Sequence, residues 1–170
     1  LLECLQLKNH HKILDVGCGL GDFLKYLRKN NLKCKYLGVD FLSEFINLAK
    51  KKYRKDRNSK FLKMDIEIDR FPKNYDWLFL SGLFNDKDIG SEAFMFKIIR
   101  KMFKASRKGI VFNSLTTHVD YKDKKLFYSN PEKAFNYCAK NLSKYIVLKT
   151  NYQLKKKTIP FEYSMAVFKK

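Results

Sequence analysis

Several features that mark common protein classes are scarce or missing in this chain of 170 residues. No apolar run approaches the roughly 18–20 residues of a membrane span, so we expect no transmembrane segment. Glycine and proline contribute only 7 and 3 residues, which excludes collagen-like and low-complexity chains. Residues 1–4 lack the charged-then-apolar pattern of a secretory leader, and the chain has no initiator methionine. We therefore expect one globular domain over residues 1–170, from a processed chain or from a fragment truncated at its N-terminus.

Arginine is scarce beside lysine, although basic residues dominate the charge. Lys and Arg number 36 against 17 Asp and Glu, a net charge of +19, but only 6 of the 36 are Arg. A basic balance suggests a nucleic-acid partner, whereas phosphate and base recognition favours the forked guanidinium of Arg. An excess of Lys together with 12 Asn is also the composition that an AT-rich genome produces on the surface of any protein. We therefore keep nucleic acid as an alternative partner without favouring it, and interpret the basic stretch 50–57 as a solvated helix end.

Closely spaced cysteine pairs are absent as well. Cys4, Cys18, Cys34 and Cys138 are scattered, with neither metal-site nor redox-pair spacing. Histidines and acids also fail to cluster at the spacing of a metal site. We expect reduced thiols, a cytoplasmic location and no bound metal.

What the chain does contain is a regular alternation of strand-like and helix-like segments. Strands are expected over residues 12–16, 35–41, 60–66, 75–80, 109–117, 145–152 and 161–169. Helices are expected from Asp22 onward, from Ser43 as a cap, over 91–105 and over 131–141. Alternation predicts an α/β fold, a mostly parallel sheet with helices on both faces. The last two strands have no helix between them, which predicts an antiparallel hairpin.

The first strand ends in a glycine triplet that leads into a helix. Gly17, Gly19 and Gly21 give a tight turn that lets a ligand approach the backbone. The dinucleotide pattern would need glycine at position 22, which is Asp22, and no Gly-Lys-Ser/Thr sequence is present. Asp40 ends the second strand and can accept hydrogen bonds from both hydroxyls of a ribose.

Asp65 ends the third strand of the expected sheet in the same way. It has two interpretations: a ligand contact, or a side chain that caps a turn.

With these residues in place, the chain resembles the class I S-adenosylmethionine-dependent methyltransferases. The segment ILDVGCGLGDF looks like their motif I, YLGVDFLSEFINLAKKKY like their second strand and helix, and YDWLFLSG like their fourth strand. The likeness runs from Lys12 to Lys170. It implies a Rossmann-like three-layer sandwich with a seven-stranded sheet in the order 3-2-1-4-5-7-6 and an antiparallel C-terminal hairpin. It also implies methyl transfer from S-adenosylmethionine, with no membrane partner.

The resemblance implies a role for each matching residue. Asp15 would steady the glycine loop and help to hold the methionine ammonium group, and Asp40 would bind the ribose. Gly17, Gly19 and Gly21 would pack against the cofactor, and Phe41 would lie against the adenine. Asp65 would accept from the adenine exocyclic amine, with Ile66 nearby, and Ser81 and Gly82 would lie beside the amino-acid part and the methyl. Phe41 as a core residue and Ser81-Gly82 as a simple turn are the structural alternatives.

The acceptor is less well marked than the cofactor. His118 follows the fifth strand, and an imidazole there would serve as general base if the acceptor must lose a proton. The Asp/Asn-Pro-Pro-aromatic motif of many amino-methyltransferases is missing at residues 81–85. We therefore expect a small-molecule acceptor, methylated at oxygen. The alternatives are an RNA or ribosomal-protein methyltransferase and an inactive cofactor-binding module; the sequence does not indicate an oligomeric state.

Overall fold

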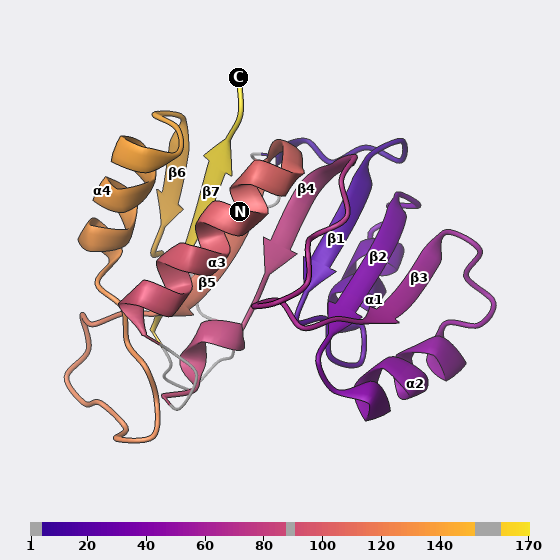
Figure 1. Ribbon diagram of the computed structural model, residues 1–170, viewed down its shortest axis with the longest axis horizontal. Helices are drawn as coiled ribbons and strands as arrows, with labels where there is room; N and C mark the ends of the chain where they lie inside the picture. The colour runs from indigo at the N-terminus through magenta and orange to yellow at the C-terminus, as the bar shows by residue number, and fades with distance from the viewer. Residues whose placement is uncertain (1–4, 88–90, 152–160) are drawn as a thin grey trace.

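The sheet that organises the molecule has seven strands in the order β3-β2-β1-β4-β5-β7-β6 (Figure 1). It is seen in a computed structural model that describes residues 5–87, 91–151 and 161–170. The strands are β1 (Lys12–Val16), β2 (Lys35–Asp40), β3 (Ser59–Lys63), β4 (Tyr75–Leu80), β5 (Ser106–Leu115), β6 (Ile146–Lys149) and β7 (Glu162–Phe168). The first five pair in parallel, while β7 is antiparallel to both β5 and β6. The predicted strand order and antiparallel ending are confirmed.

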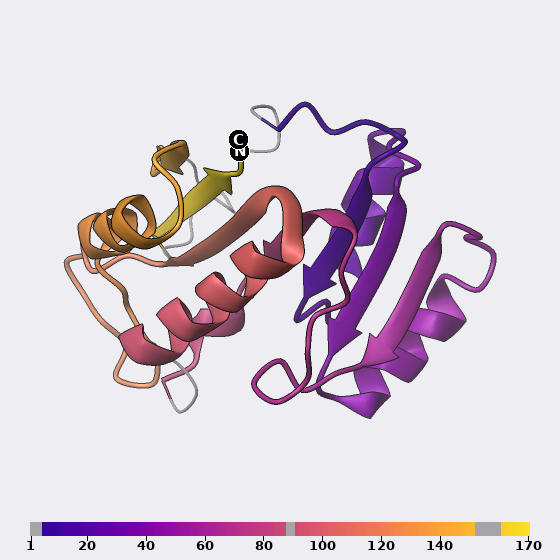
Figure 2. The same ribbon diagram turned by 45° about the horizontal axis from the view of Figure 1, so that its top comes forward.

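Helices cover both faces of this sheet. Helices α1 (Asp22–Lys29) and α2 (Ser43–Lys52) pack beside β1–β3, and α3 (Glu92–Ala105) and α4 (Pro131–Asn141) pack beside β5–β7 on the opposite face (Figure 2). In α3 the residues Met95, Ile98, Ile99 and Met102 are all buried. Their helical spacing puts them on one face, where each side chain contributes about 1.5–3 kcal/mol by leaving water.

Several boundaries differ from the sequence-based expectation, and β2, β6 and β7 are each shorter than expected. The third strand ends at Lys63, so Asp65 and Ile66 lie in the turn beyond it. The fifth strand begins at Ser106, directly after α3, and ends at Leu115. Ser43 is not a cap: it is the first residue of α2, and Leu42 precedes it without a side-chain capping bond. The amide of Leu42 instead donates to Asp40 Oδ1 at 3.0 Å, so the strand end organises the start of this helix.

Two further expectations concern membrane spans and cysteines. Within the described ranges no helix is both long and apolar enough to cross a membrane. Cys18, Cys34 and Cys138 are free and buried, while Cys4 lies outside the described residues. Burial raises the pKa of all three thiols, that of Cys138 to about 12, so each is held as a neutral thiol.

Candidate functional site

The glycine loop after β1 is tied to the end of β2 by its own backbone. The amides of Gly17 and Cys18 both donate to the carbonyl of Val39, at 2.9 and 3.0 Å. The amide of Gly19 donates to Asp40 Oδ2 at 2.9 Å. Because β1 and β2 are adjacent and parallel, their carboxyl ends bring the loop and this carboxylate together at one edge of the sheet.

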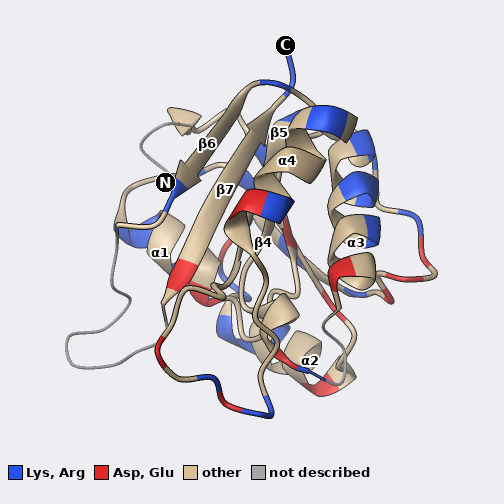
Figure 3. Ribbon diagram, turned by 90° about the vertical axis from the view of Figure 1, so that its left-hand side faces the viewer, with Lys and Arg blue, Asp and Glu red and all other residues tan. Residues whose placement is uncertain are grey.

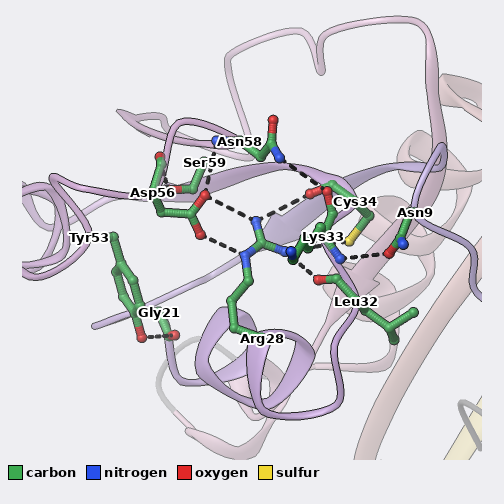
Figure 4. Close-up of polar contacts among 10 residues, drawn as sticks. All are labelled: Asn9, Gly21, Arg28, Leu32, Lys33, Cys34, Tyr53, Asp56, Asn58 and Ser59. Atoms are coloured by element: carbon green, nitrogen blue, oxygen red, sulfur yellow. Dashed lines mark hydrogen bonds and ion pairs between the residues drawn. The ribbon is translucent and has the colours of Figure 1, made fainter.

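The three glycines are required for different reasons, although all three have positive φ, at 73°, 50° and 78°. A Cβ on Gly17 would lie 2.7 Å from Leu83 Cδ1. A Cβ on Gly21 would lie 2.7 Å from the ring of Tyr53, whose hydroxyl donates to the Gly21 carbonyl at 2.7 Å (Figure 4). A Cβ on Gly19 would meet no atom within 4 Å. Gly19 is therefore the loop position whose open side is available to a ligand.

Asp40 is half-buried and already engaged through both oxygens. Oδ2 accepts from Gly19 and Oδ1 from Leu42, each through a backbone amide. A carboxylate offers about four lone-pair positions, so two remain for a ligand. This side chain therefore shapes the loop and still presents acceptors at the rim.

Asp15 is more deeply buried than Asp40, with only 4% of its surface exposed. It accepts a hydrogen bond from the hydroxyl of Tyr36, and burial raises its pKa to about 7 despite that bond. The loop amides of Gly17, Cys18 and Gly19 donate to Val39 and Asp40, while the Asp15 carboxylate bonds to Tyr36. That Asp15 steadies the glycine loop stays a prediction.

A pocket of about 510 Å³ opens between the glycine loop, the start of α1 and the strands β4, β5 and β7. Of the predicted site residues it brings together Asp15, Gly17 and Ser81. Its apolar wall includes Phe23, Phe79 and Val111, and its polar groups include Asn113 and Ser164; the other lining residues are Cys18, Asp22, Tyr26, Leu80 and Phe112. The combination of an apolar wall with few polar groups is typical of a small-molecule site.

The other seven predicted cofactor residues do not line that pocket: Gly19, Gly21, Asp40, Phe41, Asp65, Ile66 and Gly82. Three of them, Phe41, Asp65 and Ile66, lie beyond the ends of β2 and β3. Asp65 Oδ1 accepts from the amide of Glu67 at 2.9 Å, so this side chain does cap a turn. Ile66 is buried in the larger core. Phe41 is 60% exposed, and Lys63 Nζ lies 5.8 Å from its ring centre, so Phe41 is not a core residue.

A partly buried polar network, which the sequence reasoning missed, supports the loop after β4. The amide of Gly82 donates to Asn113 Oδ1 at 2.9 Å, and Asn113 Nδ2 donates to Glu162 Oε2 at 2.8 Å. Asn85 Nδ2 approaches Glu162 Oε1 at 3.5 Å. Burial raises the pKa of Glu162. The signal available in the sequence was an amide after the apolar run of β5 and a carboxylate at the start of β7.

His118 is exposed and is not among the residues that line the pocket. Its Nε2 is 3.5 Å from Glu132 Oε1, at the start of α4. The two groups are both exposed, so the pair contributes little to stability.

Comparisons with known proteins now identify the family. A family model described as a methyltransferase domain matches residues 13–109. A Mycobacterium tuberculosis protein named "Putative methyltransferase Rv1506c" is 31% identical over 153 residues, covering 86% of this chain and 90% of that protein. The chain belongs to the class I S-adenosylmethionine-dependent methyltransferases. A protein of Invertebrate iridescent virus 6, "Putative methyltransferase 235L", is 29% identical to this methyltransferase, and the matched region covers 53% of the viral protein.

Solved structures share the methyltransferase fold at low sequence identity. Magnesium protoporphyrin IX methyltransferase from Synechocystis, with bound SAH, has a TM-score of 0.77 at 10% identity, over 100% of this chain and 78% of that chain. A TehB-like S-adenosylmethionine-dependent methyltransferase from Corynebacterium glutamicum has a TM-score of 0.67 at 18% identity, over 99% and 84%. The cofactor of the present enzyme is therefore S-adenosylmethionine.

Proposed function

We propose that this methyltransferase holds S-adenosylmethionine across the carboxyl ends of β1, β2 and β4 and methylates a small molecule at oxygen. The observation that carries the proposal is the Asp40 carboxylate, which binds the amide of Gly19 and keeps lone pairs free beside the open face of that glycine.

The residues at this edge fit the cofactor. A nucleoside with a cationic amino-acid tail needs acceptors for its hydroxyls and negative charge near its tail; Asp40 and Asp15 offer these at neighbouring strand ends. When bound, the cofactor supplies a sulfonium methyl, which is already an activated electrophile. The protein then has to align the acceptor and exclude water, and alignment contributes up to about 7–11 kcal/mol in favourable cases.

The adenine end would lie beyond β2 and β3. The exposed ring of Phe41 would stack on the base. Asp65 uses Oδ1 for its own turn, and its other oxygen would accept from the exocyclic amine, with Ile66 beside it. The turn role and the ligand role of Asp65 are thus compatible.

The methionine end and the acceptor would share the pocket beside Ser81 and Gly82. The loop glycines would lie against the tail, with Gly17 lining the pocket and Gly21 supporting the turn from behind. The apolar wall would exclude water from the reacting groups. A pocket of about 510 Å³ suits a small acceptor rather than a folded macromolecule.

We propose His118 as the base for an acceptor hydroxyl; since it does not line the pocket, this role requires an acceptor that extends from the pocket past the end of β5, where Glu132 near Nε2 would stabilise the imidazolium that forms. Turnover of His118→Ala should fall by about 100-fold at neutral pH, within the usual contribution of a general base. Glu132→Gln is the milder comparison. Unchanged turnover of His118→Ala would remove this residue from the reaction.

One relative favours a macromolecular acceptor instead. A Buchnera aphidicola protein named release factor glutamine methyltransferase is 34% identical over 102 residues, which is 54% of this chain and 37% of that protein. Residues 81–85 of this chain read SGLFN, without the Asp/Asn-Pro-Pro-aromatic motif that glutamine chemistry often uses. We therefore place protein and RNA acceptors second.

The test begins with calorimetry, using S-adenosylmethionine and S-adenosylhomocysteine, where we expect micromolar dissociation constants. A screen with methyl-labelled cofactor against metabolite fractions, total RNA and ribosomal protein then identifies the acceptor class. Label in a small hydroxylated compound supports the proposal. Label only in RNA or protein overturns the acceptor, and cofactor binding without any turnover indicates a binding module.

A further inference from the structure

The edge of the sheet opposite the cofactor pocket carries a concentration of positive charge. Parallel strands begin at one edge, so their first residues form a row: Lys12 starts β1, Lys35 starts β2 and Lys60 is the second residue of β3. We call this edge, where the parallel strands begin, the amino edge. In β5, which also starts there, Arg107 and Lys108 are exposed. The row follows from the topology, because these residues are far apart in the sequence.

The centre of the amino edge is hollow rather than flat. A cavity of about 300 Å³ is lined by four cationic side chains, those of Lys12, Lys35, Arg57 and Lys60. Asn58 and the ring of Tyr75 lie among them and add hydrogen-bonding groups. No ion pair of the described residues includes any of the four cations. Like charges held together without counter-charges repel, so the hollow favours an anionic ligand.

The acids that lie near this hollow are both occupied. Asp56 forms an ion pair with Arg28 Nε at 2.6 Å (Figure 4). Asp76 is buried and accepts from the amide of Lys12 at 2.8 Å, with Arg107 Nε 4.0 Å away. Neither carboxylate neutralises the cations that line the hollow.

Acids gather instead at the opposite edge. Glu92 lies in the first turn of α3 and Glu162 is the first residue of β7. Figure 3 shows red segments at the lower ends of α3 and β7. Asp40, Asp65 and Glu67 also belong to that lower, cofactor-binding edge.

We propose that the amino edge is a docking surface for a single-stranded nucleic acid, whose phosphates lie along the row of strand starts and enter the hollow. Neighbouring strands are about 4.8 Å apart, so the cations form a linear array that matches a linear polyanion. A concave centre suits a projecting phosphate better than the flat surface of a bilayer. The stretch 50–57, interpreted above as a solvated helix end, contributes Arg57 to this surface.

Docking here is separate from methyl transfer. Strands of five or six residues, rising about 3.3 Å per residue, put roughly 17–20 Å between the two edges. The nucleic acid is therefore a second ligand, and its binding does not depend on the acceptor proposed above.

The test measures fluorescence anisotropy of labelled oligo(U) and oligo(dT), about 20 nucleotides long, at salt concentrations from about 50 to 200 mM. The test variant is Lys35→Gln/Arg57→Gln/Lys60→Gln. The matched control is Lys122→Gln/Lys124→Gln/Lys125→Gln, which removes the same charge from exposed positions beyond the carboxyl end of β5. Each lost phosphate contact lowers the slope of log affinity against log salt by about 0.7, so the test variant should lose about 2 and bind 10–100-fold more weakly.

The result expected is weaker oligonucleotide binding by the test variant alone, with S-adenosylmethionine affinity unchanged in both. Equal weakening by both variants would mean that net charge alone binds, and would overturn the proposal. So would tight binding to phosphatidylserine vesicles with no binding to either oligonucleotide. If the triple variant loses cofactor affinity, Lys60→Gln alone replaces it, and an unchanged salt slope there refutes the assignment.

Discussion

Asp40→Asn is the change that tests the cofactor site most directly. The substitution keeps the side-chain volume but replaces one anionic acceptor with an amide donor. In the folded protein Asp40 holds Gly19 and Leu42 through their amides, so its replacement disturbs the loop as well as any sugar contact. Charge-assisted hydrogen bonds contribute about 1.5–3 kcal/mol, which predicts about 10–150-fold weaker binding of S-adenosylhomocysteine.

A thermodynamic cycle separates the two effects. Wild type and variant are each titrated with S-adenosylhomocysteine and with its 2′,3′-dideoxy analogue. If Asp40 holds the ribose hydroxyls, removing the carboxylate and removing the hydroxyls each abolish the same interaction. The loss of binding free energy for the double change is then smaller than the sum of the two single losses. If Asp40 only shapes the glycine loop, the two losses add.

Calorimetry at one pH and salt concentration supplies all four binding free energies. Glu44→Gln is the matched control, since it removes one negative charge from an exposed position in the first turn of α2 on the same edge. We expect that control to bind within about twofold of wild type. Additive losses in the Asp40 cycle, or equal weakening by the control, would refute the ribose contact.

Three further predictions concern stability and the loop. Gly21→Ala should destabilise folding by about 1–3 kcal/mol in urea titrations, because φ is 78° and the new Cβ meets the ring of Tyr53, whereas Gly19→Ala should chiefly weaken cofactor binding. Burial raises the pKa of Asp15 to about 7, so between about pH 4 and 7 the folded chain keeps a proton that the unfolded chain has released. The free energy of unfolding should therefore fall by at most about 4 kcal/mol as the pH rises through that window. Asp15→Asn should lack this fall when denaturation is followed at pH 5 and pH 8. Glu162→Gln should lower the melting temperature, with a cost of about 1–3 kcal/mol, because its amide nitrogen would face an asparagine donor; an unchanged melting curve would contradict the network.

Much of the fold followed from the sequence because hydrophobic burial decides it. The run Tyr75–Leu80 was predicted with its correct ends, since its interior is apolar and Asn74 and Ser81 bound it. The third strand was predicted to end at Ile66, three residues beyond its actual end at Lys63, because Met64 and Ile66 continue the apolar pattern into a turn. The apolar pattern of a sequence indicates which residues are buried. A turn that is packed into the core therefore has the same apolar pattern as a strand.

Less of the candidate site than of the fold could be predicted from the sequence. The positions of the glycine loop and Asp40 follow from strand order alone, since topology brings the ends of β1 and β2 together. The bond from Asp15 to Tyr36 and the support of Gly82 by Asn113 depend on side-chain directions that no spacing rule encodes. The row of lysines at the amino edge also needed the strand directions before it could be recognised.

The two carboxylates nearest the glycine loop suit different tasks because their surroundings differ. Asp40 is reached by backbone amides, which stabilise its anion before any ligand arrives. Asp15 has one hydroxyl partner and is almost fully buried, so near neutral pH it is only partly ionised. A cationic amino-acid tail beside Asp15 would favour the anion and lower this pKa, so part of the binding free energy would go into releasing a proton. Cofactor binding should then release protons at pH 6 to 7 in wild type and not in Asp15→Asn, which calorimetry in buffers of different ionisation enthalpy measures directly. Equal proton release by both proteins would place the cationic tail away from Asp15.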